Sequence, residues 1–274
     1  MTASSPSREN AQMSVKVFYE DAHIAVVEKP AGVIVHQGSR GLLERTFLDD
    51  LREYFGRNDA GTSGTRLVHR LDRGTSGLMI VARSAEAAKG MSQAFRDRTV
   101  HKGYVALVFG QAPASFTVDV RLGPVLRPPR RWGVDESTGV PARTDFNCVW
   151  SSEHFSLLKV APISGRTHQI RVHSEWKGHP IVGDSWYGRD FVPITPWQKY
   201  LHERARHLCL HAFYIEFQHP IFGAALRFWC PLPEAFVEVL RSVSSRAVEV
   251  CLTEDHAEGL RYTHDLRGAD GRLR

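Results

Sequence analysis

Short apolar stretches separated by turn residues constrain the fold of this chain more than any other feature. Apolar and β-branched residues gather in runs such as Ile24–Val27, Leu78–Ala82 and Tyr104–Phe109, with Gly, Pro, Asp and Asn between them. Runs of this length are typical of strands, whereas a membrane-spanning helix needs about 20 consecutive apolar residues. The chain is therefore predicted to be rich in strands and not to cross a membrane.

Turn residues and apolar periodicity divide the chain into elements. Two strands are predicted within 15–29 around a turn at 20–23, and further strands at 67–71, 78–82, 104–109, 144–149, 156–162, 213–217 and 226–229. Helices are predicted at 43–55, at 84–100 with Ser84 as N-cap, at 168–177 with Thr167 as cap, and at 233–243. Because strands outnumber helices and do not alternate regularly with them, we expect an α+β fold with a large mixed sheet.

The two ends of the chain are predicted to lie outside the main folded unit. Residues 1–14 form a predicted disordered leader that lacks the apolar segment of a secretory signal. Residues 246–274 form a polar C-terminal extension, which leaves 15–245 as one folded domain. The four cysteines, at 148, 209, 230 and 251, have no CxxC spacing. We therefore expect reduced, mostly buried thiols in a cytoplasmic protein.

The basic residues of the chain are mainly arginines. There are 35 Lys and Arg against 30 Asp and Glu, which gives a net charge of +5, and only seven of the 35 are Lys. Arginine suits bidentate contacts with phosphate and stacking on bases, but GC-rich coding DNA raises the arginine content of any protein. The composition alone therefore suggests no more than an acidic partner.

A carboxylate lies between two arginines in the segment His69–Gly77 (HRLDRGTSG). Asp72 follows a predicted apolar strand and begins a Gly-rich turn. Nearby cations keep such a carboxylate ionised, and an ionised, desolvated Asp can act as a nucleophile or base at a sugar carbon or an activated base. The same pattern also fits an Asp that caps its own turn by accepting the amide of Thr75 or Ser76.

A second cluster of polar residues lies at 164–173 (SGRTHQIRVH). Its first residues open a predicted helix whose free N–H groups favour an anion, and Arg166 and Arg171 add two guanidinium groups. An exposed basic helix fits the pattern too. His168 and His173 are five residues apart, not four as in an HExxH site, so we expect no metal there.

A third feature is the Arg- and Pro-rich segment 127–132 (RPPRRW), predicted as a loop. It places Arg127, Arg130 and Arg131 beside Trp132, and a basic loop with an aromatic residue suits phosphate binding and base stacking. A solvated surface loop fits equally well. The chain contains no GxxxxGK[ST] loop and no GxGxxG motif after a strand, so no nucleotide cofactor is expected.

Taken together, these segments resemble the RluA family of RNA pseudouridine synthases. HRLDRGTSG at 69–77 resembles the catalytic motif of that family, and KPAGVIVH at 29–36 resembles its first motif. Further matches follow in family order at 101–110 (HKGYVALVFG), 137–146 (STGVPARTDF), 163–173 (ISGRTHQIRVH), 178–188 (GHPIVGDSWYG), 206–213 (RHLCLHAF) and 217–220 (FQHP). The resemblance implies a mostly antiparallel sheet in two subdomains with a central active-site cleft, flanked by helices and loops, and makes 15–245 the catalytic domain.

The resemblance also implies a role for each matched residue. Asp72 matches the essential aspartate, which breaks the N1–C1′ bond of a uridine and allows reattachment through C5, by attack on the ribose or through a glycal-type intermediate. Arg171 matches the arginine that pairs with this aspartate, and Tyr104 matches the tyrosine that stacks on the target uracil. Arg70 matches the residue that fills the gap left by the flipped base, which offsets part of the free energy of unstacking.

The implied partner is a structured RNA, either transfer RNA or large-subunit ribosomal RNA or both. The residues expected to contact it, besides Arg70, are His69, Lys29, Lys102, Arg127, Arg130, Arg131, Arg166 and His168, although the two lysines fit simple surface positions equally well. Fewer than 20 residues precede the first predicted strand, so we expect no separate N-terminal RNA-binding domain. RNA selection is then expected to involve 127–132 and 246–274. The resemblance implies no cofactor or metal, and we expect a monomer without an obligate protein partner.

Two other functions compete with this one. An RNA-binding or assembly factor with the same fold would not need a buried acid, so the presence of Asp72, Tyr104 and Arg171 together argues against it. A nucleoside hydrolase or glycosidase would need a second carboxylate or a metal site. We therefore predict an RNA-modifying isomerase that flips its target base and works in the cytoplasm.

Overall fold

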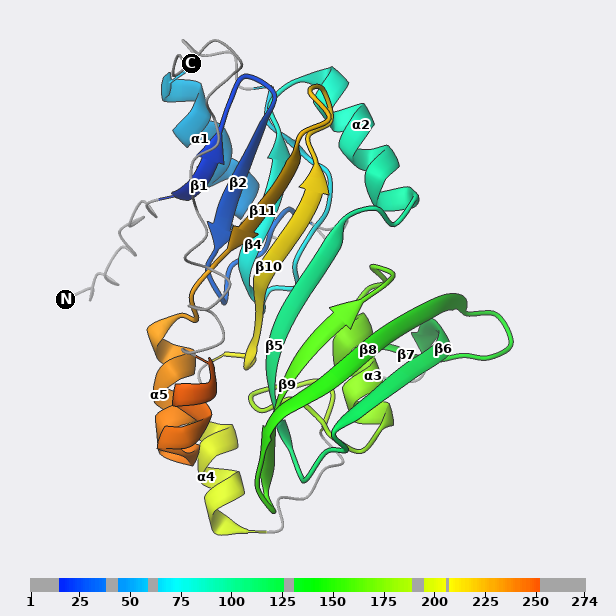
Figure 1. Ribbon diagram of the computed structural model, residues 1–274, viewed down its shortest axis with the longest axis vertical. Coiled ribbons are helices and arrows are strands. Elements are labelled where there is room, and N and C mark those ends of the chain that lie inside the picture. Colours follow the sequence, from blue (N-terminus) through cyan, green and yellow to red (C-terminus); the bar gives the residue numbers. More distant parts are fainter. Residues whose placement is uncertain are drawn as a thin grey trace, which may run out of the picture.

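Strands dominate the structure, a computed structural model that describes residues 15–37, 44–58, 64–125, 131–188, 195–205 and 207–251 (Figure 1). Eleven strands among these residues form one sheet. Nine of them follow one another across it in the order β1 (Lys16–Glu20), β2 (Ile24–Lys29), β4 (Ser76–Ala82), β10 (Leu210–Gln218), β5 (His101–Phe109), β9 (Phe155–Pro162), β8 (Val140–Ser151), β6 (Ser115–Val125) and β7 (Arg131–Val134). Of the other two, β11 (Ala225–Trp229) pairs with β10 and β3 (Arg66–Leu67) pairs with β4.

The sheet is mixed but mostly antiparallel, as predicted. Its parallel pair is β4 with β10, where Ser76 lies opposite His211 and Gly77 opposite Ala212. Gly77 has a φ of 115°, and a Cβ at this position would lie 2.2 Å from the carbonyl oxygen of Ala212, so only glycine allows the two strands to approach this closely. This close approach fixes the end of the loop that carries Asp72 into β4.

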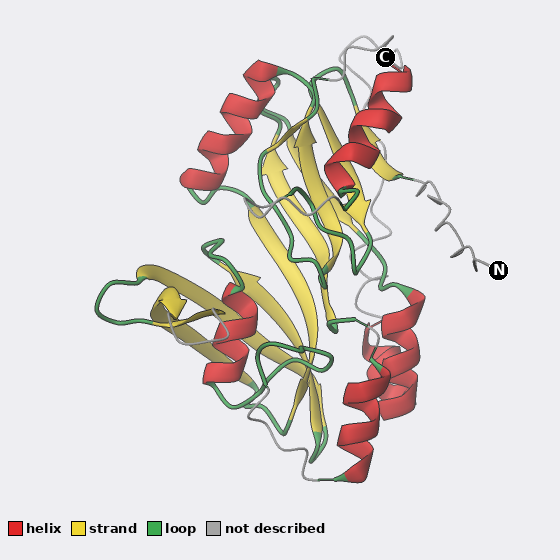
Figure 2. Ribbon diagram, turned by 180° about the vertical axis from the view of Figure 1, so that it is seen from behind, coloured by secondary structure: helices red, strands yellow, loops and turns green. Residues whose placement is uncertain are grey.

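The sheet has two halves that share the long strand β5 (Figure 1). One half contains β1, β2, β3, β4, β10 and β11, and the other contains β9, β8, β6 and β7. In the described ranges, six helices flank the sheet: α1 (Phe47–Asn58), α2 (Ala85–Arg96), α3 (Gln169–Trp176), α4 (Pro196–Arg204), α5 (Glu234–Val243) and a short unlabelled helix at 245–251. Figure 2 shows α1, α4 and α5 along one side and α2 and α3 along the other.

Helices on both faces explain why β2 and β4 are apolar almost without interruption. Successive side chains of a strand point to opposite faces, and each face of these two strands enters a different hydrophobic cluster. Ala25, Val27, Met79 and Val81 cluster with Phe47, Leu51 and Phe55 of α1, whereas Ile24, Val26, Leu78 and Ile80 cluster with Ala87 and Met91 of α2. A strand that is buried on both faces has no polar alternation.

Several element boundaries differ from the sequence-based predictions. The helix predicted at 43–55 is α1, which begins at Phe47 after Thr46 and Asp49 exchange hydrogen bonds; Leu43 lies outside the described residues. The strand predicted at 67–71 is wrong beyond Leu67, because 68–75 is an irregular loop. Ser84 is the N-cap of α2 as predicted, but α2 ends at Arg96. β6 and α4 were not predicted.

Two further corrections concern segments with expected functions. Arg131 and Trp132 belong to β7, not to a loop. The N-cap of α3 is His168, not Thr167, and its left-handed φ of 57° explains why no side chain caps this end. In the predicted C-terminal extension, 245–251 is helical and buries Ala247 and Cys251, so this part packs on the core; 252–274 and 1–14 lie outside the described residues.

No helix in the described ranges is long and apolar enough to cross a membrane. All four cysteines are free thiols, and Cys209, Cys230 and Cys251 are buried.

Candidate active site

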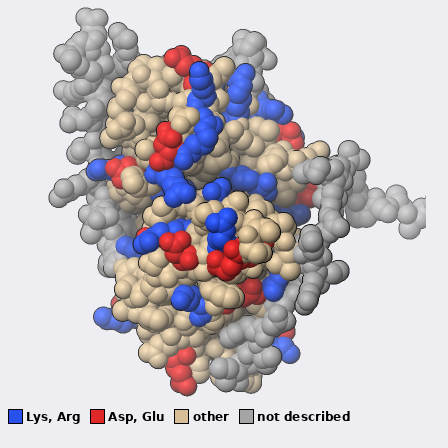
Figure 3. Space-filling model, turned by 90° about the vertical axis from the view of Figure 1, so that its right-hand side faces the viewer, with Lys and Arg blue, Asp and Glu red and all other residues tan. Residues whose placement is uncertain are grey.

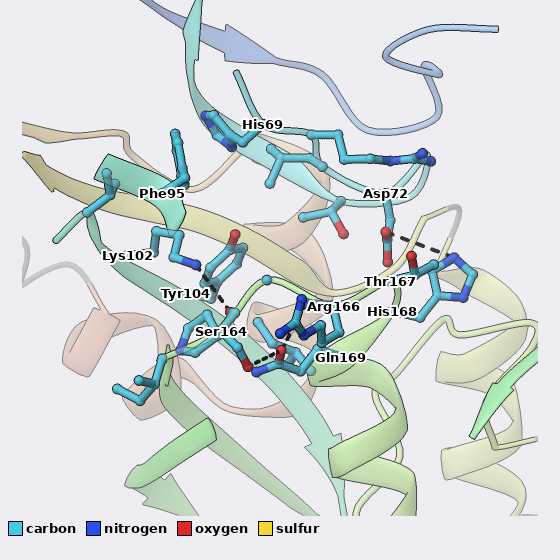
Figure 4. Close-up of a pocket in the computed structure, with 18 of the residues that line it drawn as sticks. His69, Asp72, Phe95, Lys102, Tyr104, Ser164, Arg166, Thr167, His168 and Gln169 are labelled. Atoms are coloured by element: carbon cyan, nitrogen blue, oxygen red, sulfur yellow. Dashed lines mark hydrogen bonds and ion pairs between the residues drawn. The ribbon is translucent and has the colours of Figure 1, made fainter. Parts of the chain in front are cut away.

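A cavity of about 590 Å³ lies between the two halves of the sheet. Its walls come from the loop 68–75, the C-terminal end of α2, the start of β5, the segment 162–168 and the first turn of α3. Lys and Arg side chains gather along the hollow between the upper and lower parts of the molecule (Figure 3). Asp72, Lys102, Tyr104 and Arg166 surround the cavity (Figure 4). The cavity therefore brings together residues from three of the matched segments, 69–77, 101–110 and 163–173, but none from 127–132 that the structure describes.

The main chain of Asp72 closes its turn and leaves the carboxylate available to the cavity. The N–H of Thr75 donates to the Asp72 carbonyl oxygen at 3.1 Å, and the N–H of Gly32 donates to the carbonyl of Arg73 at 2.8 Å. The side chain of Asp72 is 19% exposed, and its Oδ2 accepts a hydrogen bond of 3.1 Å from Arg171 Nη1. Turn formation thus depends on the backbone, and the carboxylate faces a cation.

Arg171 is held from two sides. Its Nη1 contacts Asp72, while its Nε and Nη2 donate to Asp184 at 2.7 and 2.9 Å. Its guanidinium also lies 4.8 Å from the centre of the Tyr187 ring. Burial alone disfavours the charged form, but the hydrogen bonds and charges of Asp184 and then Asp72 outweigh burial and raise the pKa of Arg171. The guanidinium is therefore a fixed positive charge beside Asp72.

Tyr104 lines the cavity from β5 with its side chain almost fully buried. Burial, and then the negative charge of Asp72, raise the pKa of its phenol well above the ordinary value. The phenol therefore stays protonated, and its ring offers a flat apolar surface at the bottom of the cavity.

Lys29 differs from the expected phosphate contact. It is fully buried, and its Nζ donates to the carbonyl oxygens of Pro30, Val33 and Arg73 at 2.7, 2.9 and 3.2 Å. Burial lowers its pKa to about 7, although the charge of Asp72 acts in the opposite direction. Lys29 has no surface for an RNA phosphate and instead joins the turn after β2 to the loop that carries Asp72.

Replacement of Lys29 by Met is expected to lower the free energy of unfolding by about 2–4 kcal/mol, because the buried ammonium group and its hydrogen bonds to the carbonyl oxygens of Pro30, Val33 and Arg73 are lost. Urea denaturation followed by circular dichroism measures this change. Lys16→Met is the matched control, since Lys16 lies on the adjacent strand, is 58% exposed and pairs with Glu28 at the surface; it should change the free energy by less than about 1 kcal/mol. Equal effects of the two substitutions would contradict the anchoring role.

His69 lines the cavity as a neutral ring. Its Nε2 accepts the N–H of Ile80 at 2.8 Å, and its ring lies 4.7 Å from that of Phe95. Burial, and then the charge of Lys102, lower its pKa to about 3. His69 therefore anchors the loop 68–75 to β4 and cannot bind phosphate as a cation; a contact with RNA through the rest of the ring stays a prediction.

The other residues expected to contact RNA fall into three groups. Arg70, Lys102, Arg166 and His168 line the cavity, and their contact with RNA stays a prediction. Arg131 does not line it, because its Nη1 donates to Glu175 at 3.0 Å and to the Trp186 carbonyl at 3.2 Å. Arg127 and Arg130 lie outside the described residues.

Cations dominate the lining of the cavity. It carries six Arg and Lys side chains against one carboxylate, that of Asp72; the six are Arg70, Arg96, Arg98, Lys102, Arg166 and Arg171. Sequence analysis did not single out Arg96 and Arg98, which lie at the end of α2 and become part of the site only through the fold. A cavity of this charge favours a polyanion such as RNA.

Asp184 and Tyr187 are further site residues that sequence analysis missed. Asp184 is almost fully buried and, besides holding Arg171, accepts the N–H groups of Trp186 and Tyr187 at 2.9 and 3.0 Å. The signal was present in the matched motif GHPIVGDSWYG, but a single Asp in a loop does not show by sequence that it contacts a residue of α3. Within the described ranges, His, Cys, Asp and Glu side chains form no group of three that could hold a metal ion.

The chain is similar to known proteins over most of its length. Residues 23–176 match the family model described as RNA pseudouridylate synthase. Ribosomal large subunit pseudouridine synthase C of Pasteurella multocida is 36% identical over 242 residues, 84% of this chain and 68% of that protein. Ribosomal large subunit pseudouridine synthase D of Nitrosomonas europaea is 34% identical over 247 residues, 88% of this chain and 69% of that protein.

Solved structures give the same result. The human RNA pseudouridylate synthase domain containing 4 superimposes with a TM-score of 0.68 at 26% identity, covering 83% of this chain and 92% of that chain. The family match includes Asp72, Tyr104 and Arg171, the residues that meet at the cavity. The fold, the motifs and these similarities agree, and the chain belongs to the RluA family of RNA pseudouridine synthases, which are RNA uridine isomerases.

Proposed function

We propose that this protein isomerises one uridine of large-subunit ribosomal RNA and that Asp72 is the residue that reacts with the target nucleotide. The observation that carries this proposal is the placement of Asp72. Its carboxylate lies 3.1 Å from Arg171, inside a cavity whose other charged residues are all cations. Such a site attracts an RNA backbone and places a fixed cation beside the carboxylate that faces the bound nucleotide. The names of the two bacterial relatives support the choice of ribosomal RNA. With this substrate, we propose that the protein acts in the cytoplasm and as a monomer.

The remaining residues support the reaction by position and charge. We expect the Tyr104 ring, which lines the cavity, to stack on the uracil. We expect Arg70, which is exposed and also lines the cavity, to occupy the gap left by the flipped base. Lys102 and Arg166 provide positive charge on the opposite wall. In the isomerisation the N1–C1′ bond breaks and a C5–C1′ bond forms. The hydrogen on C5 leaves as a proton, and N1 takes up a proton, so the product is an isomer of the substrate.

Loss of this hydrogen gives a direct assay. Ribosomal RNA carrying tritium at uracil C5 should release tritium to water when incubated with the protein. A pseudouridine map of cellular ribosomal RNA, with and without the gene, should then show one position that depends on it. Binding of RNA without tritium release, and without a dependent position, would favour an RNA-binding factor, whereas release of free uracil would indicate a hydrolase.

Arg98 provides a test of the RNA-binding surface that separates stability from function. It is exposed, lines the cavity and has a left-handed φ of 60°, which is unfavourable for an arginine but not for glycine. Arg98→Gly is therefore expected to leave the free energy of unfolding unchanged or to raise it by up to about 1 kcal/mol, and to weaken RNA binding about 3- to 10-fold with a shallower dependence on salt. Filter binding at several salt concentrations measures this effect.

Arg241→Gln is the matched control for the loss of one charge. Arg241 lies on α5, pairs with Glu234 and does not line the cavity, so RNA affinity should not change. Equal losses of affinity in both variants would show that net charge, not the position of Arg98, determines binding.

A further inference from the structure

Three residues form a hydrogen-bonded chain that leads to Asp72. The Trp132 N–H donates to Tyr187 Oη at 3.1 Å, and Tyr187 Oη lies 2.8 Å from His168 Nδ1. His168 Nε2 in turn lies 3.9 Å from Asp72 Oδ1. Arg171 contacts the other carboxylate oxygen, Oδ2. His168 and Arg171 therefore face different oxygens of the same carboxylate.

The surroundings of Tyr187 determine which atoms carry the protons in this series of hydrogen bonds. The Tyr187 side chain is buried, and its Oη already accepts the Trp132 N–H. A buried hydroxyl proton without an acceptor is unfavourable, and His168 Nδ1 is an acceptor at hydrogen-bonding distance. A neutral imidazole that accepts at Nδ1 carries its proton on Nε2. The N–H of His168 is thus on the side of Asp72.

The ring of His168 has little freedom to turn away. The residue is in a left-handed conformation with a φ of 57°, and its ring meets the rings of Trp186 and Tyr187 nearly at right angles, with centres 5.6 and 5.4 Å away. Burial lowers the pKa of His168, although the charge of Asp72 acts in the opposite direction, so the ring is neutral near pH 7. A neutral ring with one N–H is poorly suited to the phosphate contact that the sequence suggested.

We propose that His168 is a positioning residue that orients Asp72 for attack through its Nε2–H, with Tyr187 fixing the tautomer. This inference rests on the proposed function. Arg171 holds one carboxylate oxygen and His168 restrains the other, so the carboxylate has a single orientation when the target nucleotide arrives. The distance of 3.9 Å exceeds a hydrogen bond, and contacts of this kind are often long in free enzymes and shorten when the substrate binds.

Two substitutions distinguish the roles of the two ring nitrogens of His168. Asn tolerates the left-handed conformation and its side-chain amide reaches only the position of Nδ1, so His168→Asn removes the donor to Asp72. The longer side chain of Gln places its amide near the position of Nε2 and restores a donor. The single-turnover rate of tritium release should fall about 10- to 100-fold in His168→Asn and recover most of this loss in His168→Gln, while the Kd for RNA stays within about twofold.

Controls distinguish positioning from folding and from RNA binding. His101→Asn, at an exposed histidine that does not line the cavity, should leave rate and Kd unchanged, and thermal unfolding shows that each variant is folded. A wild-type rate in His168→Asn would overturn the proposal. A loss of RNA affinity that parallels the loss of rate and depends on salt would overturn it in favour of a direct RNA contact.

A measurement without substrate separates this inference from the proposed function. The ¹⁵N shifts of the His168 ring in the free protein should show the neutral Nε2–H tautomer, and this preference should weaken in Tyr187→Phe. The Nδ1–H tautomer, or a charged ring at pH 7, would overturn the inference even if the enzyme is active. If the wild-type protein releases no tritium from ribosomal RNA, the proposed function fails, and the ring shifts still decide the state of His168.

Discussion

Asp72→Asn is expected to reduce the rate of uridine isomerisation by about 1,000-fold or more while the protein stays folded. Asn keeps the size of the side chain but has neither the negative charge nor the nucleophilic oxygen of the carboxylate. The turn does not depend on this carboxylate, because the main-chain carbonyl of residue 72 accepts the Thr75 N–H. The single-turnover release of tritium from RNA labelled at uracil C5 measures the loss, and RNA affinity should change little.

Asp145→Asn is the matched control for the same chemical change at a surface position. Asp145 lies on β8, pairs with Arg143 at 3.3 Å and does not line the cavity, so this variant should keep the wild-type rate. If Asp72→Asn keeps more than about a tenth of the wild-type rate, Asp72 is not the reacting residue.

Among substitutions of residues that do not line the cavity, Asp184→Asn is expected to cause the largest decrease in both the free energy of unfolding and the rate of isomerisation. Asp184 is almost fully buried and makes a bidentate pair with Arg171. The uncharged amide leaves the buried guanidinium with one carboxylate partner, and removing one member of a buried ion pair costs about 3–5 kcal/mol. The rate should fall about 100-fold, because Arg171 loses the contact that holds it beside Asp72.

Urea denaturation and single-turnover kinetics, both at a temperature where the variant is folded, measure the two effects separately. Asp119→Asn is the control, because Asp119 is 61% exposed and its pair with Arg143 is 3.6 Å long; it should change the free energy of unfolding by less than about 1 kcal/mol. A stable Asp184→Asn variant with the wild-type rate would show that Arg171 keeps its place without Asp184.

The strands that position the site were predictable because their patterns are local. β2, β4 and β5 are apolar runs bounded by turn residues, and each lies within a few residues of its predicted range. The irregular loop 68–75 was predicted in part as strand, because apolar residues precede Asp72. Its conformation depends on contacts with distant residues, such as the hydrogen bond from Ile80 to His69, which no local pattern shows.

Burial and ion pairing decide which charged side chains reach the cavity and which do not. Lys29 and Arg131 were expected to contact RNA, but one is buried against three carbonyl groups and the other is paired with Glu175. Arg96 and Arg98 were not expected to do so, and both line the cavity. A sequence shows the charge of a side chain but not which surface it reaches, because that depends on how α2 and β7 pack.

The sequence by itself determined the short apolar strands, the α+β class, the family motifs and the choice of Asp72, Tyr104 and Arg171 as candidate site residues, because each depends on patterns within a few neighbouring residues. Only the tertiary structure decided how these residues meet. Asp72 and Arg171 are 99 positions apart in the chain, and their contact exists because the loop before β4 and the start of α3 face each other across one cavity. The support of Arg171 by Asp184 and the tautomer of His168 also depend on that packing, since hydrogen bonds between distant segments form only after the sheet has brought them together.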